Sequence, residues 1–151
     1  MKLICKKYAV YLDNDSDDWI KNLKLGIKPL IADGVIDELW IEKLIQTTNK
    51  LGPYFVFSDL LAMPHISPDS STKKLATGFI YCKKPLKFFG NGYEKTCQII
   101  VPLVTTDANS HMELLAQLVS LWNDQDFIKK LTSISDQKSF DSFVAGVENE
   151  S

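Results

Sequence analysis

The stretch Gly52–His65, GPYFVFSDLLAMPH, separates a helix-patterned first third of the chain from a strand-patterned middle. Its opening glycine-proline pair is typical of a helix end, and the aromatic and β-branched run Tyr54–Phe57 predicts a short strand. The stretch ends on a histidine that directly follows Pro64. Proline restricts the backbone beside it, and histidine is the side chain whose ordinary pKa lies near neutral. His65 is therefore the first candidate for a chemical role.

The residues outside this stretch predict layers of helix and strand. Apolar residues at helical spacing predict a helix that begins at Trp19 and ends at Gly34, and Pro29 inside it should kink or shorten it. The predicted elements are a strand at 6–12, helices at 19–33 and 36–50, strands at 54–57, 77–83 and 96–104, and helices at 110–122, 124–134 and 136–147. Turns are predicted at Lys84-Pro85 and at Gly90-Asn91-Gly92. This order predicts an α/β fold with a small mixed β-sheet flanked by α-helices on both sides, in a single domain spanning residues 1–151.

The composition excludes several classes of function. Hydrophobic residues make up 45% and charged residues 24% of the chain, and a net charge of −2 does not favour nucleic acid as a partner. No apolar run approaches the roughly 20 residues that cross a bilayer, and the N-terminus does not read as a signal peptide. The cysteines, Cys5, Cys82 and Cys97, lack C-x-x-C spacing. That spacing predicts reduced thiols in a cytoplasmic protein, and neither a disulfide framework nor a zinc site.

The residues around His65 suit an imidazole that accepts a phosphoryl group. Such a ring needs a fixed position, donors for three oxygens and some positive potential. Hydroxyls and lysines follow within a few residues, namely Ser67, Ser70, Ser71, Thr72, Lys73 and Lys74. The alternative is an ordinary histidine in a surface loop, and residue type and spacing alone leave it open.

The other histidine, His111, lies at a predicted helix start. The run from Ser110 to Glu113 fits a capping box, which places His111 at the first helical position. Unpaired N–H groups and the helix dipole there favour an anion and keep the ring neutral, although an exposed helix-start histidine explains the pattern equally well. The two histidines with Asp69 or Asp107 could bind zinc, but no ligand spacing supports such a site. Serine-triad and phosphate-loop motifs are absent.

Several ordered segments together resemble a known family. GPYFV at 52–56, LAMPH at 61–65 and DANSH at 107–111 are similar to the enzyme IIA component of the sugar phosphotransferase system, in its mannitol/fructose class and closest to the ascorbate-specific branch. LATGF at 75–79 also fits, and the similarity runs in order from about Trp19 to Phe143. The resemblance implies a mixed sheet flanked by helices.

The resemblance also implies a function, that of a phosphoryl carrier. His65 would accept a phosphoryl group on Nε2 from the phosphocarrier HPr and pass it to a cysteine of an enzyme IIB partner, for a sugar of ascorbate type that enters through the membrane enzyme IIC. His111 would hydrogen-bond the phosphoryl group, with Ser67 and Ser110 as further candidates to stabilise it. Transfer of this kind rests on positioning and electrostatics, so neither a metal nor an organic cofactor is expected. A homodimer is left open.

One departure from the family pattern concerns charge. The chain has no arginine, so a guanidinium cannot clamp the phosphoryl group, and Asn49 and Lys50 stand near the helix end where related proteins tend to carry one. Stabilisation must come from backbone N–H groups, His111, hydroxyls or a lysine. Two alternatives remain: a regulatory enzyme IIA-like domain whose phosphorylation switches a protein contact, and an inactive relative. The absence of a helix-turn-helix or basic patch counts against the first, and the presence of both histidines against the second.

Overall fold

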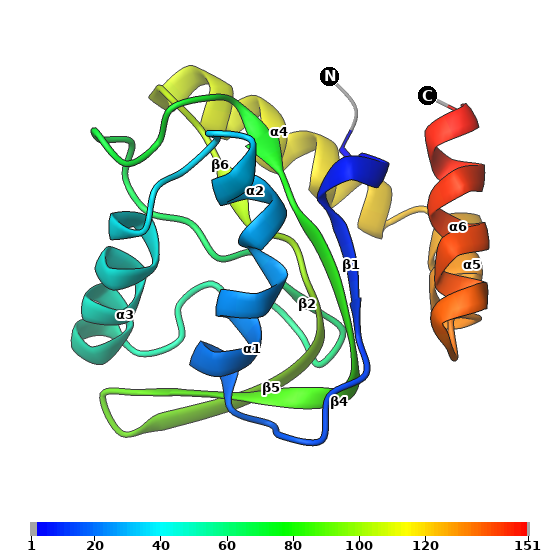
Figure 1. Cartoon of the computed structure of the whole chain (residues 1–151), viewed down its shortest axis with the longest axis horizontal. Helices are drawn as coiled ribbons and strands as arrows, with labels where there is room; N and C mark the ends of the chain where they lie inside the picture. The colour runs from blue at the N-terminus through cyan, green and yellow to red at the C-terminus, as the bar shows by residue number, and fades with distance from the viewer. Residues whose placement is uncertain (1–2, 151) are drawn as a thin grey trace.

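The computed structural model describes residues 3–150, with side chains to residue 148, and is built on a four-stranded mixed sheet (Figure 1). Residues 1–2 and 151 of the predicted domain lie outside the described range. The strand order is β1-β4-β5-β2, where β1 is parallel to β4, β4 antiparallel to β5 and β2 parallel to β5. A separate antiparallel pair joins β3 to β6. The strands are β1 Ala9–Leu12, β2 Leu61–Ala62, β3 Ala76–Thr77, β4 Phe79–Gly90, β5 Tyr93–Ile100 and β6 Leu103–Val104.

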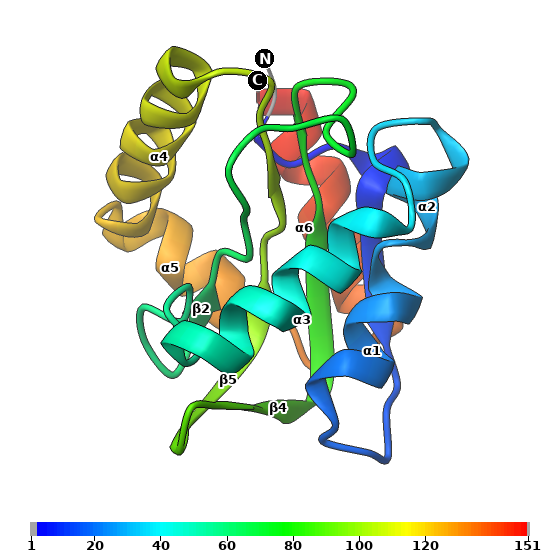
Figure 2. The same ribbon diagram turned by 90° about the vertical axis from the view of Figure 1, so that its left-hand side faces the viewer.

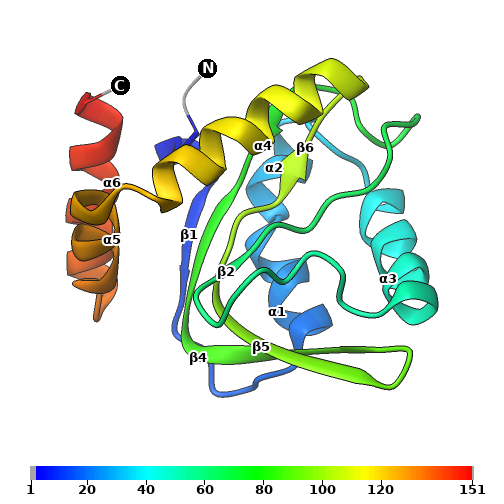
Figure 3. The same ribbon diagram turned by 180° about the vertical axis from the view of Figure 1, so that it is seen from behind.

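Helices cover both faces of the sheet, which confirms the predicted fold class (Figures 1 and 3). The helices of the first face are α1 Trp19–Gly26, α2 Lys28–Ala32 and α3 Leu39–Leu51, and those of the other side are α4 Ala108–Trp122, α5 Gln125–Thr132 and α6 Gln137–Glu150. Alternate residues of β4 separate the two buried clusters, since Ile80 packs with the first helices and Phe79 with the second. No helix in the described part of the chain is long and apolar enough to cross a membrane.

Three helical predictions needed correction. The predicted helix over 19–33 is two helices, because it breaks at Ile27 and Pro29 then lies in the first turn of α2, where its missing N–H is tolerated. Similarly, α3 begins at Leu39 and not at residue 36. The helix predicted from Ser110 begins earlier, at Ala108, with Asp107 as its N-cap. The capping box at Ser110 was therefore wrong.

The strand predictions were wrong in more places. Residues 54–57 form no strand, and only Val56 makes an isolated bridge, to Ala62. A 3-10 turn occupies Lys6–Tyr8 before β1, and the strand predicted over 96–104 divides into β5 and β6 around Pro102. The turn predicted at Lys84-Pro85 lies inside β4, where the ladder with β5 shifts register. The turn at Gly90-Asn91-Gly92 is confirmed, with positive φ at Asn91 (49°) and Gly92 (77°).

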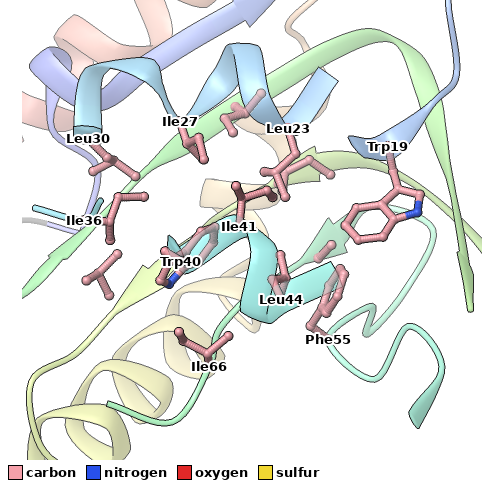
Figure 4. Packing of buried hydrophobic residues seen from close by; sticks show 14 of the residues in the cluster. Trp19, Leu23, Ile27, Leu30, Ile36, Trp40, Ile41, Leu44, Phe55 and Ile66 are labelled. Carbon is pink, nitrogen blue, oxygen red and sulfur yellow. The ribbon is translucent and has the colours of Figure 1, made fainter. Parts of the chain in front are cut away.

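Helix α3 lies against the sheet at the β4–β5 hairpin (Figure 2). A Cβ added to Gly90 would come within 2.2 Å of the carbonyl oxygen of Thr48, so only glycine allows this approach. Figure 4 shows Trp40 and Leu44 of α3 in one buried cluster with Phe55 and Ile66. Phe55 precedes β2 in the chain and Ile66 lies in the loop after it, next to His65. This packing therefore fixes α3 relative to the segment that carries His65.

Candidate functional site

Backbone hydrogen bonds hold the loop that carries His65 against the end of the sheet. His65 follows β2 by three residues, and the carbonyl of Pro64 accepts from the N–H of Leu103 at 2.9 Å. One step earlier, the carbonyl of Ala62 accepts from the N–H of Val101 at 2.8 Å. The chain before the histidine therefore runs beside the segment that links β5 to β6, and the position of His65 is set by a part of the chain far away in sequence.

The ring of His65 is oriented by a second hydrogen bond. Its Nδ1 lies 2.6 Å from the carbonyl oxygen of Met63. A carbonyl oxygen can only accept, so Nδ1 carries the proton and Nε2 keeps its lone pair. Tyr54 packs edge-on against the ring, with centroids 5.4 Å apart, and its hydroxyl donates to the backbone carbonyl of His65. Backbone and ring are thus both fixed.

Burial sets the charge of the site. Desolvation lowers the pKa of His65 below its ordinary value, against the opposing effect of the hydrogen bond to Met63, and the nearby charge of His111 lowers it further. The imidazole is therefore neutral at neutral pH. Burial also raises the pKa of Tyr54 to about 12, so its hydroxyl stays protonated and remains a donor.

The structure brings the two histidines together. The rings of His65 and His111 have centroids 5.0 Å apart and are tilted by 48°. His111 lies in the first turn of α4 but is not the first residue, and its backbone N–H already donates to the carbonyl of Asp107. The predicted anion site at an unpaired His111 N–H is therefore wrong. His111 faces His65 with its side chain and not with its backbone.

The two candidate serines have different surroundings. Ser67 lines a pocket of about 390 Å³ beside His65, whose lining residues are Lys43, Gln46, Thr47, Leu51, Tyr54, His65, Ile66, Ser67 and Asp69. Ser110 lies on α4, where both its N–H and its hydroxyl donate to the carboxylate of Asp107. The Ser110 hydroxyl is therefore engaged in capping the helix.

The carboxylates near the histidines are likewise engaged. Asp69 accepts from Lys43 Nζ at 2.5 Å and from the N–H and hydroxyl of Ser71 at 2.7 and 2.6 Å. Desolvation opposes ionisation of Asp69, but its hydrogen bonds to Lys43 and Ser71 together lower its pKa; Asp107 caps α4, and its hydrogen bonds to Ser110 lower its pKa as well. Within the part of the chain that the structure describes, no three His, Cys, Asp or Glu side chains are grouped to hold a metal ion. The donor set at His65 therefore does not fit a zinc site.

Sequence reasoning did not identify the α3 side of the site. Lys43, Gln46 and Thr47 line the pocket from this helix. The available signal was the placement of Lys43 and Thr47 four residues apart, next to the apolar stripe of Trp40 and Leu44. Polar residues at the edge of the buried face of a helix lie between the hydrophobic core and solvent, which is where a pocket can form.

A comparison with protein families decides the identity of the chain. The family described as phosphoenolpyruvate-dependent sugar phosphotransferase system, EIIA 2, matches residues 3–146. The chain belongs to this family. It is therefore an EIIA protein of a phosphotransferase system, a family of phosphoryl carriers in sugar transport, as its sequence features suggested.

Individual relatives agree with this assignment. The EIIA chain is 28% identical over 129 residues to the ascorbate-specific EIIA component of Escherichia coli (strain K12), which covers 85% of this chain and 83% of the relative. Its fold is that of the mannitol-specific cryptic phosphotransferase enzyme IIA of Escherichia coli, with a TM-score of 0.77, 20% identity and coverage of 94% and 95%. It is also similar to the mannitol enzyme IIA solved in a complex with phosphorylated enzyme IIB from Escherichia coli, with a TM-score of 0.70, 14% identity and coverage of 97% and 99%.

Proposed function

We propose that this EIIA protein carries a phosphoryl group on Nε2 of His65. The observation that supports this most directly is the 2.6 Å contact between Nδ1 and the carbonyl of Met63, which leaves Nε2 as the nitrogen with a free lone pair. A lowered pKa keeps the ring neutral and nucleophilic at neutral pH. The ring is also half-buried and fixed by Tyr54, so little reorganisation is needed at the moment of reaction.

In the first transfer, phosphorylated HPr is the donor. The Nε2 lone pair of His65 attacks phosphorus in line with the departing donor atom, and the new N–P bond forms as the donor–phosphorus bond breaks. The donor keeps the electron pair of that bond, and the Nδ1 proton stays on its hydrogen bond to Met63 throughout. His111, whose ring lies 5.0 Å from that of His65, and Ser67, which lines the adjoining pocket, would donate to the phosphoryl oxygens as charge develops on them.

In the second transfer, a cysteine thiolate of an enzyme IIB partner attacks the phosphorus. The S–P bond forms, the N–P bond breaks and its electron pair returns to Nε2. The acceptor is assigned to a partner because two of the cysteines of this chain, Cys82 and Cys97, are buried in the core and burial raises the pKa of each thiol to about 12. A thiol with so high a pKa is a poor nucleophile.

The substrate system is assigned by similarity. The curated relatives at 28% identity are named ascorbate-specific, so we assign an ascorbate-type sugar that enters through a membrane enzyme IIC, with this protein acting in the cytoplasm. The solved complex of a mannitol enzyme IIA with phosphorylated enzyme IIB supports an enzyme IIB partner here.

The test is reconstitution with purified components. Incubation with HPr, enzyme I and phosphoenolpyruvate should add one acid-labile phosphate, and His65→Gln should abolish it, whereas His111→Ala should still be labelled. The labelled protein should then pass its phosphate to the enzyme IIB protein of an ascorbate system. Label that persists in His65→Gln would rule out the assignment of the acceptor. Label that forms on His65 but is never passed to any enzyme IIB protein would favour the regulatory alternative.

A further inference from the structure

We infer that Lys43 is the cation that neutralises the phosphoryl group on His65, and that it does so by exchanging Asp69 for the phosphoryl oxygens. This inference rests on the proposed function of His65. Its starting point is the pocket beside the histidine, which α3 closes on one side and the loop after His65 on the other. Of the described residues that line this pocket, Lys43 is the one cation.

The position of Lys43 is held by an ion pair. Its Nζ lies 2.5 Å from Oδ2 of Asp69, and the two side chains are 36% and 33% exposed. Ion pairs at such partly exposed positions contribute little to stability because water and salt screen them. The pair therefore positions the ammonium group at the wall of the pocket, but it is weak enough to break when a stronger partner arrives.

Asp69 does not depend on Lys43 for its own position. Its other oxygen, Oδ1, accepts from both the N–H and the hydroxyl of Ser71, and its backbone N–H donates to Thr72 Oγ1 at 2.9 Å. Ser71 is fully buried, and the bridge between Thr72 and Ile36 anchors this loop. The carboxylate thus remains hydrogen-bonded when the lysine leaves, so the exchange exposes no unpaired buried group.

The charges favour the exchange once the phosphoryl group arrives. A phosphoryl group carries about −1.5 to −2 charges at neutral pH, against −1 for a carboxylate, and offers three acceptor oxygens. Lysine suits this movement because its ammonium is a compact charge on a flexible four-carbon stem. The chain contains no arginine that could hold the phosphoryl group with a planar fork.

The neighbouring lysines have other surroundings. Lys73 lies 3.7 Å from the carboxylate of Asp37, and Lys74 donates to the backbone carbonyl of Asp33 at 3.0 Å. Lys50 lies in the last turn of α3, is exposed and does not line the pocket. Lys50 therefore serves as the matched control, because it is an exposed lysine on the same helix outside the pocket.

Four variants test the inference: Lys43→Met, Lys43→Arg, Asp69→Asn and Lys50→Met. The measurement is the single-turnover rate of phosphoryl acceptance at saturating phosphorylated HPr, with thermal unfolding of each variant followed in parallel. Lys43→Met should slow acceptance by about 10- to 100-fold, and Lys43→Arg should recover most of that loss. Asp69→Asn should retain at least the wild-type rate because it frees the ammonium group, and Lys50→Met should also match the wild type.

The outcomes separate this inference from its rivals. If the ion pair were only structural, Lys43→Met and Asp69→Asn would lose rate and stability together, which would overturn the inference. The inference would also be overturned if Lys43→Met kept the wild-type rate at saturating phosphorylated HPr, or if it changed only the HPr concentration needed for half-saturation. A loss of rate seen in Lys50→Met alone would overturn it as well. Should Lys43→Met fail to fold, Lys43→Gln takes its place. If the wild-type protein itself accepts no phosphate, the proposed function fails and the inference fails with it, whereas a labelled wild type with an unaffected Lys43→Met contradicts the role of Lys43 alone.

Discussion

Replacing His111 with alanine should separate the electrostatic and the hydrogen-bonding effects of this ring. The two histidine rings lie 5.0 Å apart, and the pKa of His65 is lowered chiefly by desolvation and further by the charge of His111. Without His111, the pKa of His65 should rise toward its ordinary value of 6.5. The phosphoryl group should also lose one hydrogen bond, which is worth about 1–3 kcal/mol in the transition state and corresponds to a roughly 10- to 100-fold slower transfer.

Two measurements on one variant check this reasoning. NMR titration of the remaining histidine gives the pKa of His65, and rapid-quench kinetics with phosphorylated HPr give the rate of transfer. Gln117→Ala is the matched control, since Gln117 is exposed on the same helix α4. A raised pKa with an unchanged rate would show that His111 is a neighbour of His65 without a bond to the phosphoryl group. An unchanged pKa and an unchanged rate would refute both parts of the argument.

Three further predictions concern pH, packing and thiols. Because burial lowers the pKa of His65, the neutral, reactive ring should persist below pH 6.5, and the acid limb of the transfer rate should have its midpoint below pH 6.5. The unfolded chain binds this proton more tightly than the folded chain does. The free energy of unfolding should therefore fall as the pH drops below 6.5. In urea unfolding, Gly90→Ala should destabilise the protein by about 1–3 kcal/mol because its Cβ meets the Thr48 carbonyl, whereas Gly146→Ala in the open part of α6 should stabilise it slightly. A variant with all three cysteines replaced by serine or alanine should, if folded, accept and pass on phosphate at nearly the wild-type rate, and loss of transfer with retained folding would place the thiol step in this chain.

The fold was largely predictable because its signals are local and periodic. The strand predicted over 77–83 is found as the first part of β4, and alternation along it places Ile80 with one buried cluster and Phe79 with the other. The strand predicted at 54–57 failed because strand propensity says nothing about partners. The position beside β5 is taken by Leu61–Ala62, which leaves the earlier run a single bridge. Lys84-Pro85 read as a turn, but its residues are exposed at a register shift of β4, where a proline is accommodated within a strand.

The candidate residues of the site could be named from the sequence, but their geometry could not. A histidine after a proline is visible in the sequence, but the bond from Nδ1 to Met63 depends on a ring orientation that no spacing specifies. The pair of Lys43 with Asp69 joins residues 26 positions apart on a helix and a loop, so only the folded chain shows it. The N-cap moved from Ser110 to Asp107 because the carboxylate of Asp107 accepts from Ser110, a competition that pattern matching does not weigh.

These contacts indicate different roles for the backbone, which positions His65, and for the side chains, which supply charge. Most of the groups that place His65 are main-chain carbonyls, those of Ala62, Met63 and Pro64, to which Tyr54 adds one side chain that packs on the ring. His65 can therefore keep its position while most of the sequence around it changes, which is consistent with a fold shared at a TM-score of 0.77 and 20% identity with a solved enzyme IIA. The countercharge for the phosphoryl group has no such backbone support, because it must come from a side chain that reaches the pocket. In a chain without arginine that requirement falls on a lysine, and the geometry of the pocket gives Lys43 this role.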